Sequence, residues 1–146
     1  MMMNMAQEAY RRTNVETADI ASLVLMCYDA TIRDLQQAKE YHASHCMDAA
    51  YERIRHGQDL ITELLVGLDF ERGGEIAVNL SRIYNYLLRE LIGINSTKPP
   101  ETYNNLIDIL KELREGWQEV KRKYDRGELN LDVQEVAGNW ARSVTA

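Results

Sequence analysis

The first 56 residues of this 146-residue chain contain neither glycine nor proline. The chain has only two prolines, Pro99 and Pro100, and these are adjacent. β-Sandwiches and small barrels need frequent turns built from glycine and proline, so such a long uninterrupted stretch favours helices. Apolar residues make up 45% of the sequence, which is enough to fill the core of one domain of this length. The sequence therefore predicts a single all-α domain.

Apolar residues recur every three or four positions in four stretches, as expected for helices that each bury one face. The predicted helices cover residues 20–44, 49–68, 76–94 and 100–124. Asp19 and Asp48 are suited to cap the first two helices, and Gly73-Gly74 breaks the pattern within the connection Asp69–Gly74. Pro100 suits the first turn of the fourth helix. Short connections between long amphipathic helices predict an antiparallel up-down four-helix bundle.

The residues predicted to face the core share this helical spacing. In the first two helices they are Val24, Cys27, Tyr28, Thr31, Leu35, Ala38 and Tyr41, then Ala50, Ile54, Gly57, Ile61, Leu64 and Leu68. In the last two they are Ile76, Leu80, Ile83, Tyr84, Leu87, Leu88, Leu91 and Ile94, then Tyr103, Leu106, Ile107, Leu110, Leu113, Trp117, Val120 and Tyr124.

The bundle is predicted to occupy residues 19–126, which leaves a segment at each end. Residues 1–18 contain four of the six methionines together with Tyr10 and Val15. Residues 127–146 form a C-terminal extension whose large apolar residues are Leu129, Leu131, Val133, Val136 and Trp140. Both segments are too apolar for inert tails and too short to fold alone. We expect the first to be flexible or to cap the bundle, and the second to be partly helical.

Charge and hydropathy exclude several classes of protein. The net charge of −6 and the isoelectric point of about 5.1 argue against a nucleic-acid-binding domain, which normally carries a basic stripe. The sequence has no uninterrupted stretch of 18 apolar residues, so it predicts no membrane-spanning helix. Its amino terminus lacks the pattern of a secretion signal. If Cys27 and Cys46 lie on one helix, they are too far apart for a disulfide, so we expect reduced thiols and a cytosolic protein.

The short motif His42-Ala43-Ser44-His45-Cys46 resembles a metal-binding site. On a helix, His42 and Cys46 share a face, whereas His45 points elsewhere, and the only other histidine is His56. Paired Glu-x-x-His motifs of a di-iron bundle, glycine-rich phosphate loops and a Gly-x-Ser-x-Gly motif are all absent from the sequence. We interpret the motif as a solvated helix end and expect no catalytic residues, no metal and no cofactor. A metal-binding bundle is the alternative.

The stretch from Leu23 to Cys27 is apolar on every side of its predicted helix, which exceeds what one core face requires. Together with eight tyrosines, this surplus suggests a groove that receives a helix or an extended peptide. Two alternatives stay open. In the first alternative, tyrosines such as Tyr28 and Tyr84 belong to the core. In the other, the surplus is buried between copies of a homo-oligomeric bundle with a structural or regulatory role.

Three strings of residues, in the same order as the predicted helices, resemble the FliS family of flagellar secretion chaperones. They are Tyr10…Val15-x-Thr17-Ala18-Asp19-x-x-x-Leu23-Val24-x-Met26-x-Tyr28-Asp29, Leu68-Asp69…Gly73-Gly74-Glu75-Ile76-Ala77-x-Asn79-Leu80…Tyr84-x-Tyr86…Arg89-x-Leu91, and Leu113-Arg114-Glu115-x-Trp117. The sequence departs from the family pattern at three positions, with Ile20 in place of proline, Ala30 in place of glycine, and Glu90 in place of the second arginine of a pair.

The resemblance implies a cytosolic, non-enzymatic chaperone that binds the disordered C-terminal segment of flagellin. Such a chaperone prevents premature polymerisation and assists delivery to the flagellar type III export apparatus. The export gate and regulatory proteins are further candidate partners, and we expect a monomer or a weak dimer. In this family the amino-terminal segment covers the groove when flagellin is absent, which implies that role for residues 1–18. The expected partner-binding residues are Tyr10, Val15, Leu23, Val24, Met26 and Tyr28.

Overall fold

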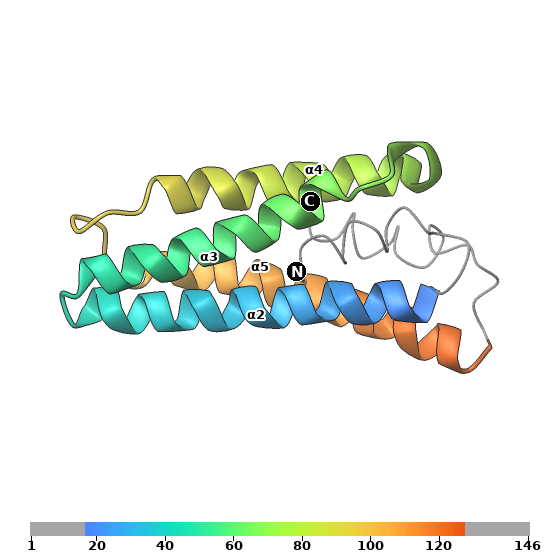
Figure 1. Ribbon diagram of the computed structural model, residues 1–146, viewed down its shortest axis with the longest axis horizontal. Helices are drawn as coiled ribbons and strands as arrows, with labels where there is room; N and C mark the ends of the chain where they lie inside the picture. Colours follow the sequence, from blue (N-terminus) through green and yellow to red (C-terminus); the bar gives the residue numbers. More distant parts are fainter. Residues whose placement is uncertain (1–16, 128–146) are drawn as a thin grey trace.

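The computed structural model describes residues 17–127, and all regular elements in this range are helices. They are α2 (Thr17–Ala43), α3 (Met47–Val66), α4 (Phe70–Ile92) and α5 (Thr102–Asp125). α2 packs against both α3 and α5, and α3 packs against α4. Successive helices run in opposite directions (Figure 1). The predicted all-α four-helix bundle is therefore confirmed. Residues 1–16 and 128–146, with Tyr10, Val15 and almost all of both predicted end segments, lie outside the described residues.

The two predicted aspartate caps at the start of the first two helices are wrong. α2 already begins at Thr17, so Asp19 lies within its first turn. α3 begins at Met47, and its N-cap residue is Cys46, which makes no capping hydrogen bond through its side chain. Asp48 is instead an acidic residue in the first turn, where its charge favours the positive end of the helix dipole.

The turn between α2 and α3 reverses the chain within three residues. His45 adopts a left-handed conformation with a φ of 61°, the Cys46 N–H donates to the Tyr41 carbonyl at 2.8 Å, and the His45 N–H donates to the His42 carbonyl at 3.1 Å. These bonds form the Schellman arrangement that ends many helices. The sharp reversal aligns α3 against α2.

The connection predicted at Asp69–Gly74 is largely helical. Asp69 caps α4, because its carboxylate accepts hydrogen bonds from the backbone N–H groups of Glu71 and Arg72, each at 3.1 Å. The helical turn that follows is interrupted at Gly74, whose φ of 50° and ψ of −127° lie outside the helical region. The glycine pair therefore marks a kink near the start of α4, where a connection was predicted.

Pro100 also lies outside the helix that it was predicted to begin. α5 starts at Thr102, and the preceding turn is closed by hydrogen bonds from the N–H groups of Thr102 and Tyr103 to the carbonyls of Pro99 and Pro100. The two prolines thus form the turn that leads into α5.

The core lies along the centre of the bundle and follows the predicted stripes closely. Most of the predicted inward-facing residues are buried, but Tyr41 is 42% exposed, and Leu68, Ile76 and Leu88 are half-buried. The side chain of Tyr124 lies outside the described part of the structure. The largest fully buried side chains of the core are Tyr28, Tyr84, Tyr103, Leu35, Ile61, Leu64, Leu87, Leu91, Leu106, Leu110, Leu113 and Val24. Helical periodicity therefore identified the core faces of all four helices.

Candidate functional site

The predicted partner-binding residues of α2 divide between the core and the surface. Val24 is 1% exposed and Tyr28 is fully buried, whereas Leu23 is half-buried and Met26 is 52% exposed. Met26 projects away from the core because it stands two positions from both Val24 and Tyr28, about half a turn around the helix. Of these four residues, only Leu23 and Met26 are accessible to a partner in the folded bundle.

The apolar surplus of the first helix is smaller than its sequence suggests. Cys27 is 1% exposed, and Leu25 is partly buried against the core. α2 contacts α3 on one side and α5 on the other, so residues that flank its inward stripe are covered as well. Contacts within the bundle therefore account for most of the stretch from Leu23 to Cys27.

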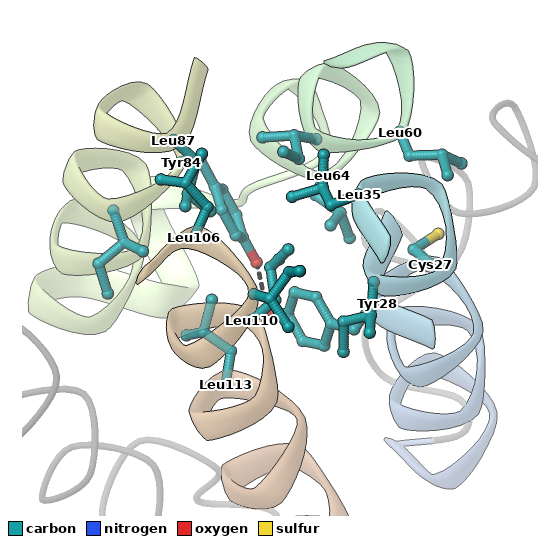
Figure 2. Close-up of a cluster of buried hydrophobic side chains, with 14 of the residues drawn as sticks. Cys27, Tyr28, Leu35, Leu60, Leu64, Tyr84, Leu87, Leu106, Leu110 and Leu113 are labelled. Carbon is teal, nitrogen blue, oxygen red and sulfur yellow. Dashed lines mark hydrogen bonds between the residues drawn. The ribbon is translucent and has the colours of Figure 1, made fainter. Parts of the chain in front are cut away.

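Three aromatic side chains from three helices meet at the centre of the core. The hydroxyls of Tyr28 and Tyr84 lie 2.6 Å apart. Figure 2 shows the two side chains pointing toward each other from α2 and α4. The indole N–H of Trp117, on α5, donates to the Tyr28 hydroxyl at 3.1 Å. Burial raises the pKa of Tyr28 far above its usual value, so its hydroxyl keeps its proton and can donate. The network joins α2, α4 and α5 into one scaffold behind the accessible surface.

His42 is buried, so its interpretation as part of a solvated helix end is wrong. It is 5% exposed, its Nε2 donates to the Lys98 carbonyl at 2.7 Å, and its Nδ1 lies 3.0 Å from the Tyr103 hydroxyl. The ring thus ties the loop between α4 and α5 to the end of α2. The sequence held a signal for this role, because His42 follows Leu35 and Ala38 at helical spacing on the inward stripe.

A second histidine forms a hydrogen bond with a buried carboxylate between α2 and α3. Asp34 is 4% exposed and accepts a hydrogen bond of 2.5 Å from Nδ1 of His56, while the Arg53 guanidinium lies 3.5 Å from its other oxygen. Gly57 lies against the same region, since a Cβ atom there would be 3.7 Å from the Asp34 Cβ. These contacts give Asp34 a structural role at a close helix approach, which the sequence analysis did not identify.

The described residues offer no arrangement suited to a metal ion. Between residues 17 and 127, no group of three or more histidine, cysteine, aspartate or glutamate side chains could hold one. A hollow between α2 and α5 combines two lysines, Lys39 and Lys111, with two carboxylates, Glu40 and Asp108. Its opposite charges balance, so the hollow favours neither an anion nor a cation.

Large apolar side chains are exposed at both ends of the bundle. The large apolar residues that are exposed are Met26, Tyr41, Tyr51, Val66, Phe70, Val78 and Ile92. Val66 and Phe70 flank the turn between α3 and α4, whereas Ile92 lies at the opposite end of α4. None of the helices in residues 17–127 is long and apolar enough to span a membrane.

Comparison with known proteins relates this helical scaffold to one family. Residues 2–124 match the family model described as flagellar protein FliS. The chain belongs to the FliS family. The match covers the whole bundle up to the last turn of α5, and it confirms the resemblance that the three sequence strings indicated.

Curated relatives carry the same family name. The flagellar secretion chaperone FliS of Vibrio cholerae is 26% identical over 133 residues, which cover 88% of this chain and 95% of the relative. The FliS of Salmonella typhimurium is 29% identical over 121 residues, covering 80% and 90%. The FliS of Campylobacter jejuni is 28% identical over 120 residues, covering 82% and 94%. Relatives from three organisms thus match this FliS chain over most of their length.

Proposed function

We propose that this FliS-family protein is a cytosolic export chaperone that binds the disordered C-terminal segment of flagellin. Binding there keeps flagellin from polymerising prematurely and assists its delivery to the flagellar type III export apparatus. The observation that carries the proposal is the family match over residues 2–124, which spans all four helices. The relatives' name, flagellar secretion chaperone, supports the same role.

The physical chemistry of the bundle suits such a partner. A disordered segment loses conformational entropy when it binds, so its chaperone needs an extended apolar surface to offset that cost. The Tyr28, Tyr84 and Trp117 network fixes three helices relative to one another. A rigid scaffold limits the further ordering cost on the chaperone's side.

We assign the α2 part of the binding surface to Leu23 and Met26. Both remain accessible in the closed bundle, whereas Val24 and Tyr28 support that surface from within. Burying a methionine or leucine side chain contributes about 1.5–3 kcal/mol, so several such contacts are needed to order a long segment. Tyr10 and Val15 stay predicted contributors from the amino-terminal segment.

Titration calorimetry with a peptide from the C-terminal end of the flagellin of the same organism tests this proposal. We expect a one-to-one complex, and Met26→Asp should weaken binding by about tenfold or more because a buried apolar contact is lost. Tyr41→Asp is the matched control, since Tyr41 is also exposed on α2 but lies toward its other end. Equal weakening by both variants would contradict the assigned surface.

The absence of heat and of any complex at peptide concentrations on the order of tens of micromolar would refute flagellin binding itself. Light scattering adds a second criterion, because a dimer that persists with bound peptide would support the homo-oligomeric alternative. Removing residues 1–16 leaves α2 intact, and we expect it to increase hydrophobic-dye binding without loss of helicity. Unchanged dye binding would contradict a covering role for that segment.

A further inference from the structure

The C-terminal extension extends beyond the family match, which ends at residue 124. Four of its large apolar residues are spaced by four, three and four positions: Leu129, Val133, Val136 and Trp140. This spacing places all four on one face of a helix, and the residues between them are mostly polar. An isolated helix of 12 residues is marginal in water. A helix over 129–140 therefore needs an apolar surface on which to pack.

The extension cannot simply prolong α5. That helix ends at Asp125, and Gly127 adopts a φ of 70°, in the left-handed region. Glycine in this conformation typically follows the last turn of a helix and redirects the chain. α5 therefore stops before the C-terminal extension begins, at the end of the bundle where Gly127 lies.

An apolar surface without a described partner lies at this same end. Val66 and Phe70, on either side of the turn between α3 and α4, are 56% and 52% exposed. Leu65 and Leu68 are close to them in the sequence and are partly buried against the core. Figure 1 shows that this turn, the start of α2 and the end of α5 all lie at one end of the bundle. We call the four residues the α3–α4 turn patch.

We propose that residues 129–140 form a helix that packs across this end of the bundle, with Val136 and Trp140 against the α3–α4 turn patch. Twelve helical residues span about 18 Å, whereas the diagonal of a four-helix bundle whose neighbouring helices lie about 8–10 Å apart is about 14 Å. The helix is therefore long enough to run from the end of α5 to the turn. Covalent attachment favours this occupant over a second copy, because a short tether gives an effective concentration in the millimolar range.

This inference goes beyond flagellin binding and does not depend on it. The α3–α4 turn patch is distinct from the α2 surface that contains Met26. Covering Phe70 and Val66 would remove exposed apolar area from the free protein and reduce self-association.

Acrylamide quenching of Trp140 fluorescence in the full-length protein tests the proposal. The fluorescence of Trp117, which is 6% exposed, is measured separately in a Trp140→Phe version of each protein. It is then subtracted from the total fluorescence to leave the signal of Trp140. We expect Trp140 to be protected in the parent protein. Phe70→Lys should raise its quenching constant toward the value of the urea-unfolded chain. Ile92→Lys is the matched control at the opposite end of the bundle and should leave the quenching constant unchanged.

A second variant disrupts the apolar face of the proposed helix 129–140 and leaves the α3–α4 turn patch unchanged. Val136→Asp should also expose Trp140, and circular dichroism should show a loss of helix with the bundle's cooperative unfolding retained. Three results would overturn the proposal: a Trp140 in the parent that is quenched as in urea, protection that survives Phe70→Lys, or protection that increases with protein concentration. The last would assign the surface to a second copy.

Discussion

The hydroxyl oxygens of Tyr28 and Tyr84 lie 2.6 Å apart at the centre of the bundle, although the two residues are 56 positions apart in the sequence. Tyr28 belongs to α2 and Tyr84 to α4, and Trp117 of α5 donates to the same Tyr28 oxygen. Because directional hydrogen bonds join three helices here, the network fixes their relative positions more tightly than apolar contacts alone.

Tyr28→Phe should destabilise the protein by about 1–3 kcal/mol, because it leaves the buried indole N–H of Trp117 without its acceptor. Urea denaturation monitored by circular dichroism measures the change. Tyr51→Phe is the control, since Tyr51 is 42% exposed, and it should change the free energy of unfolding by less than about 0.5 kcal/mol. Tyr28→Phe combined with Trp117→Phe should cost less than the sum of the single changes. Strict additivity would contradict the network.

Stability should fall as the pH rises above 9. Burial, with a smaller contribution from the charge of Glu63, raises the pKa of Cys27 to about 11, and burial raises the pKa of Tyr103 to about 12. The unfolded chain releases these protons at lower pH than the folded protein does, so stability is complete below pH 9 and is lost as the pH rises toward 11 and 12. Each such group contributes a slope of at most about 1.4 kcal/mol per pH unit.

Urea unfolding at a series of pH values between 8 and 10.5 measures this slope. Cys27→Ala should make the slope shallower between pH 9 and 10.5, because one of the perturbed groups is gone. Cys46→Ala is the matched control, since Cys46 is exposed. The same slope in both variants would show that Cys27 does not carry the effect.

His42→Ala should release the loop between α4 and α5 from the end of α2. It removes both the hydrogen bond to the Lys98 carbonyl and the contact with the Tyr103 hydroxyl, at a cost of about 1–3 kcal/mol. Hydrogen exchange measured by mass spectrometry should speed up selectively in residues 95–103. Lys98→Ala keeps the backbone carbonyl and should leave exchange there unchanged, so equal effects of the two variants would contradict the role of the histidine ring.

Two glycines should respond to alanine in opposite directions. A Cβ atom at Gly57 would meet Thr31, Asp34 and Leu35 at 3.6–3.8 Å, which is ordinary contact, so Gly57→Ala should stabilise α3 by about 0.5–1 kcal/mol. Gly74 has a φ of 50° and a ψ of −127°, and Gly74→Ala should cost at least about 1 kcal/mol. Thermal unfolding measures both changes. If Gly57→Ala destabilises the protein, the contact between α2 and α3 does not adjust to accommodate the added methyl group.

Much of the fold was predictable because its signals are local. Apolar spacing of three and four positions located four helices and most of the buried residues, since this period is set by the geometry of a single helix. Helix ends were less predictable. Asp19 and Asp48 are good capping residues by type, yet the helices begin at Thr17 and Met47. Helix ends shift by one or two residues around a good capping residue, so residue type alone does not fix where a helix begins.

The candidate site was less predictable than the fold. Leu23, Val24, Met26 and Cys27 are alike in type, and their sequence gives no direct measure of what covers each one. The two neighbours of α2 cover Val24 and Cys27 and leave Met26 exposed. The hydrogen bonds of His42 show the same limit, since its partners, Lys98 in the loop before α5 and Tyr103 in α5, lie more than fifty residues away.

The sequence by itself determined that this chain is a bundle of four amphipathic helices of the FliS family, because helical period and family strings are properties of neighbouring residues. Only the tertiary structure decided that Tyr28 is joined to Tyr84 and Trp117, that His42 bonds to Lys98 and Tyr103, and that Met26 and Phe70 remain exposed. The reason is physical: burial and hydrogen bonding depend on which surfaces meet across the bundle, and those surfaces belong to residues far apart in the chain.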